Sequence, residues 1–268
     1  MSKSVSILVV YFPQTGQWER IVRSMLEPLM ARSDVRIDWH AVDTTPAFRF
    51  PWRFLSFLDA FPESVYLDPP PSSQTRIDAA REYDLIVLAY QVWFLAPSQP
   101  IVAFLRSAEA EVLRGRRVMT VIGCRNMWTT AHTTMRGLLD RAGARLIDNV
   151  VLTDSGPFWS TFITTPWWML TGRRKLPGLP AAGINGVDIA RAARFGRALR
   201  EALPAISRGD TGPFLGGLGA VNVARSTMLA ERIGHRSFRI WGRIVRAAGR
   251  PGAATRKPIL VVYCAFLI

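Results

Sequence analysis

Runs of apolar residues alternate with amphipathic stretches over the first 155 residues. The runs are rich in Val, Ile and Leu with few polar interruptions, which is typical of strands covered on both faces. Strands that alternate with helices predict a parallel sheet flanked by helices. The expected strands span residues 5–11, 35–42, 84–90, 117–123 and 145–152, and the expected helices span residues 16–32, 100–108 and 132–142.

The connection between the second and third expected strands is longer than a crossover requires. Residues 44–80 are rich in proline and in phenylalanine and tryptophan. One interpretation is an elaborated crossover that folds over the sheet edge or over a ligand. The other is ordinary surface packing, and the sequence leaves both open.

The pattern changes after residue 155. Residues 156–170 are apolar and aromatic with almost no charge, and a further helix is expected at about residues 188–203. Residues 259–268 are also apolar, but they are about half the length of a membrane-spanning helix. They predict a buried strand, a buried helix or an end that dips into a membrane.

A basic amphipathic helix is expected over residues 232–250. Its arginines are spaced three and four residues apart, which places them on one helical face, with isoleucines to one side. Such helices lie on anionic membrane surfaces. A solvated face of a packed helix and nucleic-acid binding are the alternatives, although no nucleic-acid-binding motif accompanies the helix and we expect no nucleic-acid partner.

The charge of the chain supports this division into two parts. The net charge is +14; residues 171–268 hold 17 basic and 4 acidic side chains, whereas residues 1–170 hold 17 and 16. A basic segment favours an anionic partner. The two cysteines are too far apart for a disulfide framework or a metal site, so we expect a cytoplasmic protein, peripheral to the membrane if the basic helix binds there, with no metal.

Candidate chemistry lies in loops that follow the first, third and fourth expected strands. The carboxyl ends of parallel strands meet at one edge of a sheet, where ligands bind. In the first loop, Thr15 and Gly16 precede a helix, which favours a phosphate at the helix N-terminus. The dinucleotide and nucleoside-triphosphate fingerprints are absent, so the loop favours a monophosphate.

The other two loops are suited to a flat ring. Trp93 and Phe94 in the second loop can stack on a ring system, although capping of the core is the alternative. In the third loop, Asn126 is suited to hydrogen bonding with a polar ring edge. Arg125 is suited to pairing with an anionic ring or substrate, or to an ordinary surface ion pair.

Together, the three loops resemble those of the flavodoxin family over residues 5–155. The resemblance implies a flavodoxin-like three-layer α/β/α sandwich, residues 1–155, with a five-stranded parallel sheet in the order 2-1-3-4-5. Residues 156–268 then form a helical, basic C-terminal extension. The resemblance also implies that FMN is bound by Gln14, Thr15, Gly16, Gln17, Gln91, Trp93, Phe94, Gly123 and Asn126. The chain departs from the family at Pro13 and Trp18, where the family commonly has Ser and Thr.

Longer strings resemble bacterial proteins named dialkylresorcinol condensing enzymes. These strings are residues 11–17, 90–98, 121–128 and 168–172. No Cys-His-Asn or Cys-His-His grouping of a ketosynthase can be placed. The resemblance therefore implies a flavin step in secondary metabolism, such as aromatising a dialkyl cyclohexanedione to a dialkylresorcinol.

These features predict an FMN-dependent oxidoreductase that acts on an apolar, lipid-like ring compound. His132, Arg125 and Tyr90 are the candidate catalytic residues, with His132 as acid–base because it begins the helix after the third loop. The alternatives are an electron carrier, an NAD(P)H:quinone reductase and a scaffold that no longer binds flavin. NAD(P)H is a candidate second cofactor and a homodimer is a candidate assembly.

Overall fold

The computed structural model describes residues 4–73, 77, 81–223 and 225–267. The remaining residues, 1–3, 74–76, 78–80, 224 and 268, belong to the predicted domains, crossover and C-terminal segment and lie outside the described residues.

Parallel strands form the central sheet in the order β2-β1-β3-β5-β6. They are β1 (Val5–Tyr11), β2 (Val35–Ala41), β3 (Leu85–Trp93), β5 (Arg117–Cys124) and β6 (Arg145–Thr153). The short β4 (Ala96–Pro97) pairs antiparallel with the end of β3. The order of the parallel strands confirms the predicted flavodoxin-like topology, and it reverses between β1 and β3, where such sheets bind ligands.

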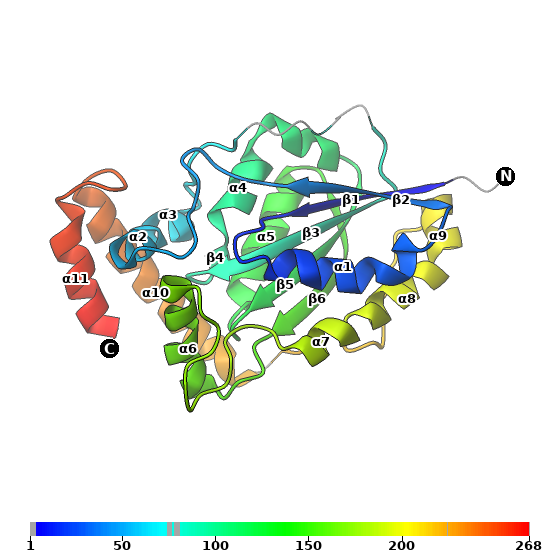
Figure 1. Cartoon of the computed structure of the whole chain (residues 1–268). Helices are drawn as coiled ribbons and strands as arrows, with labels where there is room; N and C mark the ends of the chain where they lie inside the picture. Colours follow the sequence, from blue (N-terminus) through cyan, green and yellow to red (C-terminus); the bar gives the residue numbers. More distant parts are fainter. Residues whose placement is uncertain (1–3, 74–76, 78–80, 224, 268) are drawn as a thin grey trace.

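Helices cover both faces of the sheet (Figure 1), which confirms the three-layer sandwich. The helices of the first part are α1 (Gln17–Met30), α2 (Phe54–Asp59), α3 (Phe61–Tyr66), α4 (Gln99–Arg106), the 3-10 helix η1 (Ala108–Leu113) and α5 (Thr129–Arg141). Those of the second part are α6 (Phe158–Thr171), α7 (Gly186–Arg191), α8 (Ala193–Glu201), α9 (Leu203–Arg208), α10 (Arg225–Ala247) and α11 (Arg256–Leu267).

The two core clusters follow from the alternation of side chains along buried strands. Ile7 and Val9 of β1 point to the face covered by α1 and α8, whereas Leu8 and Val10 point to the face covered by α4 and α5. The central strands β1 and β3 therefore bury residues on both sides, which explains their nearly continuous apolar sequences, whereas the edge strand β2 alternates apolar and polar residues.

Part of the C-terminal region completes the sandwich. The predicted helix at residues 188–203 is divided at Ala192 into α7 and α8, and α8 packs directly on α1. A Cβ atom at Gly196 would lie 1.9 Å from the carbonyl oxygen of Met25, so only glycine allows this approach. Phe195 and Leu199 are buried in the same cluster as β1 and α1.

Helices α2, α3, α6, α10 and α11 lie beyond the carboxyl edge of the sheet (Figure 1) and form a lobe there. Helices α2 and α3, from the long crossover, pack against α10 and α11 around a separate core cluster, which includes Phe61 and Tyr263. The fully buried Arg256 pairs with Asp59 and Glu63 inside this lobe. The C-terminal apolar segment is helical, one of the predicted alternatives. No helix in the described ranges is long and apolar enough to cross a membrane.

Candidate functional site

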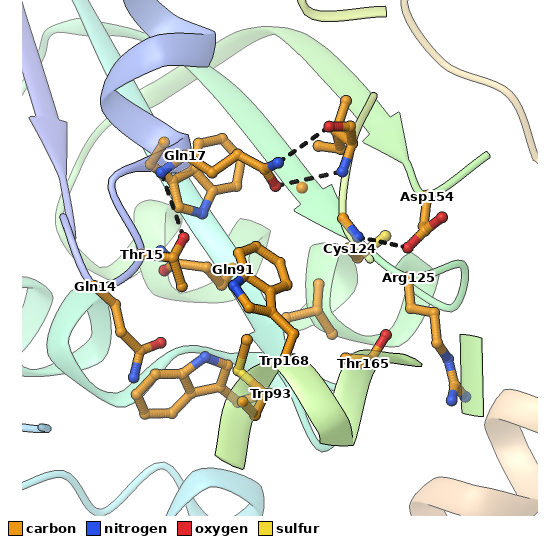
Figure 2. A pocket seen from close by; sticks show the side chains of 16 residues that line it. Gln14, Thr15, Gln17, Gln91, Trp93, Cys124, Arg125, Asp154, Thr165 and Trp168 are labelled. Carbon is orange, nitrogen blue, oxygen red and sulfur yellow. Dashed lines mark hydrogen bonds between the residues drawn. The ribbon is translucent and has the colours of Figure 1, made fainter. Parts of the chain in front are cut away.

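The structure brings the three predicted loops together around a cavity of about 130 Å³ at the carboxyl edge of the sheet (Figure 2). The first wall is built by the last residues of β3 and β5 and by residues that follow β1, β5 and β6. The opposite wall consists of Thr165, Trp168 and Met169 of α6 together with Gly183 and Ile184. Of the predicted site residues, those lining this cavity are Gln14, Thr15, Gln17, Gln91, Trp93, Gly123 and Arg125.

The loop after β1 presents hydrogen-bond donors at the start of α1. Gly16 has a φ of 67° and its N–H donates to the carbonyl of Pro13, which turns the chain into the helix. The N-cap residue of α1 is Gly16, which has no capping side chain, and the Thr15 hydroxyl accepts a long hydrogen bond of 3.4 Å from the Gln17 N–H. The buried Nε2 of Gln14 has no hydrogen-bond partner. A helix N-terminus capped by glycine, beside an unpartnered amide donor, is suited to an anion such as a phosphate monoester.

Residues 172–184, which we call the closing segment, cover the outer side of this loop. The Gln17 amide exchanges two hydrogen bonds with the backbone of Ile184, at 3.0 and 3.3 Å. Arg174 donates to the carbonyls of Ala182 and Ile184, and the Gly183 N–H donates to Asp154 at 2.8 Å. The side chain of Gln17, predicted as a cofactor ligand, is thus engaged in holding the closing segment.

Trp18 fills the space between α1 and β5. Its indole is buried, and a Cβ atom at Gly123 would lie 2.5 Å from its Cζ2 atom. Trp18 therefore requires glycine at position 123. The departure from the family at Trp18 is accommodated by Gly123 at the end of β5 and leaves Gly16 at the N-terminus of α1.

Hydrogen bonds and ring contacts fix the last residues of β3. Gln91 donates to the carbonyl of Phe12 at 2.9 Å and accepts from Ser98 at 3.1 Å, which ties the end of β3 to the first loop. The ring of Trp93 meets the rings of Phe48 and Trp52 edge-on, with centroids 5.1 and 5.4 Å apart. Trp93 is therefore held rigidly at the cavity wall.

A strained two-residue turn follows Trp93. Phe94 and Leu95 have φ angles of 50° and 62°, and they join β3 to β4. Hairpin turns of this kind require positive φ at both positions, which Asn and Gly normally supply. The turn directs Phe94 away from the first cavity and into a second one.

The second cavity is apolar and measures about 400 Å³. It is within the range of about 300–1,000 Å³ typical of small-molecule sites. The residues that line it but not the first cavity are Trp52, Phe57, Phe94, Leu95, Asn126, Met127, Phe162, Pro166, Ala230, Gly234 and Phe238. The two cavities share Val92, Trp93, Cys124, Arg125, Thr165 and Met169, so they adjoin.

Arg125 lies in the wall shared by the two cavities. Its guanidinium carbon is 3.7 Å from the ring centroid of Phe162. Burial lowers the pKa of Arg125, while the charge of Asp154 opposes this shift. Burial also raises the pKa of the neighbouring Cys124 thiol to about 12, so this thiol stays protonated and unreactive at neutral pH.

Two predicted catalytic residues line neither cavity. Tyr90 is fully buried in the core, where burial raises the pKa of its phenol well above the ordinary value. His132 lies on α5, with its ring centroid 5.8 Å from that of Trp128, and burial lowers its pKa. Their catalytic roles stay predictions that the shape of the site does not support. No cluster of His, Cys, Asp and Glu within the described part of the chain is arranged to hold a metal ion.

The sequence interpretation missed one wall of the site. Asp154 follows β6 directly, so the strand-end signal used for the other loops was sufficient to find it. The contributions of Gly183 and Ile184 carried no local signal, because both contact Gln17, which lies more than a hundred positions away in the sequence.

No known family model and no curated protein match this chain. Solved structures resemble it in fold. A flavoprotein from Lactobacillus acidophilus, crystallised in complex with FMN, is 16% identical and aligns over 56% of this chain and 93% of its own, with a TM-score of 0.41. An archaeal flavodoxin is 9% identical over 75% of this chain and 99% of its own, with a TM-score of 0.41. A flavone reductase is 14% identical over 78% of this chain and 66% of its own, with a TM-score of 0.39. The flavodoxin-like fold of this chain is assigned from its own strand order, independently of these similarities.

Proposed function

We propose that this chain is an FMN-dependent oxidoreductase that acts on an apolar ring compound. The observation that carries the proposal is the adjacency of two different cavities. One contains a helix N-terminus and the unpartnered amide of Gln14; the other is apolar; and they share six lining residues. A cofactor with a phosphate and a flat ring, beside an apolar substrate, suits this arrangement.

The residues present fit FMN at both ends. Thr15, Gly16 and Gln14 would hold the phosphate, and Gln91 and Trp93 would contact the ring. The first cavity alone, at about 130 Å³, is smaller than typical ligand sites of about 300 Å³ or more. The ring therefore needs space from the adjoining cavity. When bound, FMN supplies the capacity to accept or donate a hydride.

Arg125 is the residue of this chain best placed to act on a substrate. It faces both cavities and carries a positive charge in a largely buried position, where charge stabilisation is strong. We assign it to stabilising an enolate or phenolate oxygen of the ring. Aromatising a dialkyl cyclohexanedione removes two hydrogens from a ring that bears such oxygens, and the resemblance to dialkylresorcinol condensing enzymes favours this substrate class.

A scaffold without flavin is the second candidate. The observation that favours it is the closing segment, because both polar atoms of the Gln17 amide are engaged by Ile184. If this segment stays closed, the first cavity admits only a small anion.

The visible absorbance spectrum of the purified chain, before and after FMN is added, separates the two candidates. We expect flavin bands, and we expect Gln14→Leu to weaken FMN binding by about tenfold or more, because a hydrogen bond to a charged group contributes about 1.5–3 kcal/mol. Riboflavin, which lacks the phosphate, is the control, and its affinity should not change. A colourless protein that ignores FMN would establish the scaffold.

Turnover tests the role of Arg125. We expect Arg125→Gln to keep FMN bound and to slow oxidation of a dialkyl cyclohexanedione by about 10²-fold or more, as when one charge-stabilising group is removed. Unchanged turnover would remove Arg125 from the mechanism. Turnover with a quinone but not with the dione would indicate a quinone reductase.

A further inference from the structure

Helix α10 presents two adjacent stripes to solvent. One is aliphatic and consists of Leu229, Ile233, Ile240 and Ile244; the other is basic and consists of Arg232, Arg236, Arg239 and Arg243. At 100° per residue, each stripe occupies an arc of about 60°. The aliphatic side chains are 45–66% exposed. They face away from the core, because the buried residues Glu231 and Val245 lie on the opposite side of α10.

Two neighbouring helices also expose large hydrophobic side chains. Helix α6 exposes Trp159, Phe162 and Ile163, and α11 exposes Val261, Val262 and Phe266, each at 50–62%. Phe266 contacts Trp241 of α10, with ring centroids 5.3 Å apart. Together, α6, α10 and α11 carry ten of the sixteen large hydrophobic side chains exposed in the described residues. Such a concentration on one lobe marks an interaction surface.

This surface leads into the apolar cavity. Ala230 and Gly234, which flank the aliphatic stripe on α10, line the cavity. Phe162 of α6 is half exposed and also lines it. A ligand dissolved in an apolar phase at this surface therefore has an apolar path to the wall that contains Arg125.

We propose that α6, α10 and α11 dock on a membrane that contains anionic phospholipids, and that the apolar cavity receives its substrate from the acyl chains. The docking stands independently of the proposed function, whereas the substrate delivery rests on it. Parallel stripes of aliphatic and basic side chains match the boundary between acyl chains and headgroups. Arginine is well suited to phospholipid phosphates because its planar guanidinium binds them in a bidentate manner.

A second copy of the chain fits this surface less well. Residues 171–268 hold 17 basic and 4 acidic side chains, and one of the acidic ones, Glu231, is buried. A symmetric contact would bring the two basic stripes together with almost no acidic side chains to compensate, and like charges across an interface are unfavourable.

Co-sedimentation of the full chain with vesicles tests the docking. We expect binding to vesicles of phosphatidylcholine with added phosphatidylglycerol, little binding to phosphatidylcholine alone, and weakening by salt. The double variant Arg236→Gln/Arg243→Gln should bind at least about tenfold more weakly, since each basic side chain near an anionic surface contributes about 1 kcal/mol. Ile233→Ser/Ile240→Ser should also lose binding, even at low salt.

Matched variants on the opposite side of the molecule control for charge and hydrophobicity. Arg197→Gln/Arg200→Gln on α8 removes the same charge from exposed positions, and Val187→Ser on α7 removes an exposed apolar side chain. Both should bind vesicles like the unmodified chain. Equal loss in these controls, or no preference for phosphatidylglycerol, would overturn the proposal. So would a dimer in solution that Ile233→Ser/Ile240→Ser dissociates.

Quenching of tryptophan fluorescence by brominated acyl chains tests the delivery of substrate. Trp159 is 62% exposed on α6, so we expect quenching in the bound protein and less quenching in Trp159→Phe. Binding without quenching would mean adsorption to headgroups only and would end the delivery proposal. Neither readout requires flavin, so a chain that docks but ignores FMN would retain the docking and lose the proposed function.

Discussion

At the residue scale, the site depends on glycines that leave room for larger neighbours. Gly123 makes room for the indole of Trp18, and Gly183 lies where a Cβ atom would come 2.7 Å from Trp168 and 2.9 Å from the Gln17 amide oxygen. The contacts of Gly123 with Trp18 and of Gly183 with Gln17 join elements that are distant in the sequence. Helix α1 therefore packs against β5 and against the closing segment only with a minimal side chain at each position.

Gly183→Ala should destabilise the protein and disrupt the closing segment. The residue has a φ of 81°, which costs an alanine about 1 kcal/mol, and the clash adds about 1–3 kcal/mol. Gly178→Ala is the matched control, because Gly178 has a φ of 78° but nothing within 4 Å of its Cβ position. Denaturant unfolding of both variants measures the difference, and equal losses would contradict the close packing at Gly183.

The position of each residue relative to the end of its strand or helix explains why some site residues were predictable and others were not. Thr15 and Arg125 follow strands and Gln91 lies near the end of β3, and the strand-end rule placed all three at the cavity. Tyr90 lies inside β3, where alternation turns its side chain into the core instead. His132 was assigned to the start of a helix, but α5 begins three residues earlier, at Thr129, so His132 lies one turn further from the edge.

At the element scale, α10 is fastened to the sandwich at its N-terminal half by one carboxylate. Glu231 is buried and accepts hydrogen bonds from the N–H groups of Trp128, Thr129 and Thr130 and from both threonine hydroxyls. It thereby caps α5, whose own residues supply no side-chain cap. A carboxylate at a helix N-terminus is stabilised by the helix dipole as well as by the hydrogen bonds.

Glu231→Gln should therefore destabilise the protein by about 1–3 kcal/mol, because a charged acceptor is lost and an amide N–H is placed against backbone donors. Denaturant unfolding measures the loss. Glu201→Gln removes the same charge from an exposed position on α8 and should change stability by less than about 0.5 kcal/mol. An unchanged stability in Glu231→Gln would show that α10 is held by its apolar contacts alone.

Most elements could be predicted because their signals are local. The five parallel strands begin and end within a few residues of the expected positions, and β1 spans residues 5–11 as expected. The prediction for β3 stopped at residue 90, whereas the strand continues to Trp93. The turn that ends it uses Phe94 and Leu95 in place of Asn and Gly, so the usual turn signal is missing.

At the scale of the whole molecule, the basic C-terminal region is divided between two roles that its sequence does not distinguish. Residues 186–208 complete the sandwich on α1, and residues 225–267 form the lobe with α2 and α3. The sequence did not show what the long crossover at residues 44–80 packs against, since the partners of Phe61 and Glu63 are Tyr263 and Arg256, near the C-terminus. Pairing over such separations leaves no periodic trace in the sequence.

The buried histidines make the stability of the whole molecule depend on pH. Burial lowers the pKa of His40, His132 and His235 below the ordinary value of about 6.5. The unfolded chain then binds more protons than the folded one as the pH falls below about 6.5. The stabilisation from neutral histidines is complete above that pH, and it is lost as the pH falls through the lower pKa values of the folded state.

The free energy of unfolding should therefore decrease between about pH 7 and pH 5, with a slope of at most about 1.4 kcal/mol per pH unit for each histidine. Buried carboxyls such as Glu63, whose pKa is raised by burial, contribute with the opposite sign, because the folded state then binds the proton more readily than the unfolded chain. The contribution of the carboxyls is the same in His132→Gln and in the unmodified chain, so it cancels when the two pH profiles are compared. The variant should lose less stability than the unmodified chain over this range; parallel profiles would mean that His132 is protonated equally in both states.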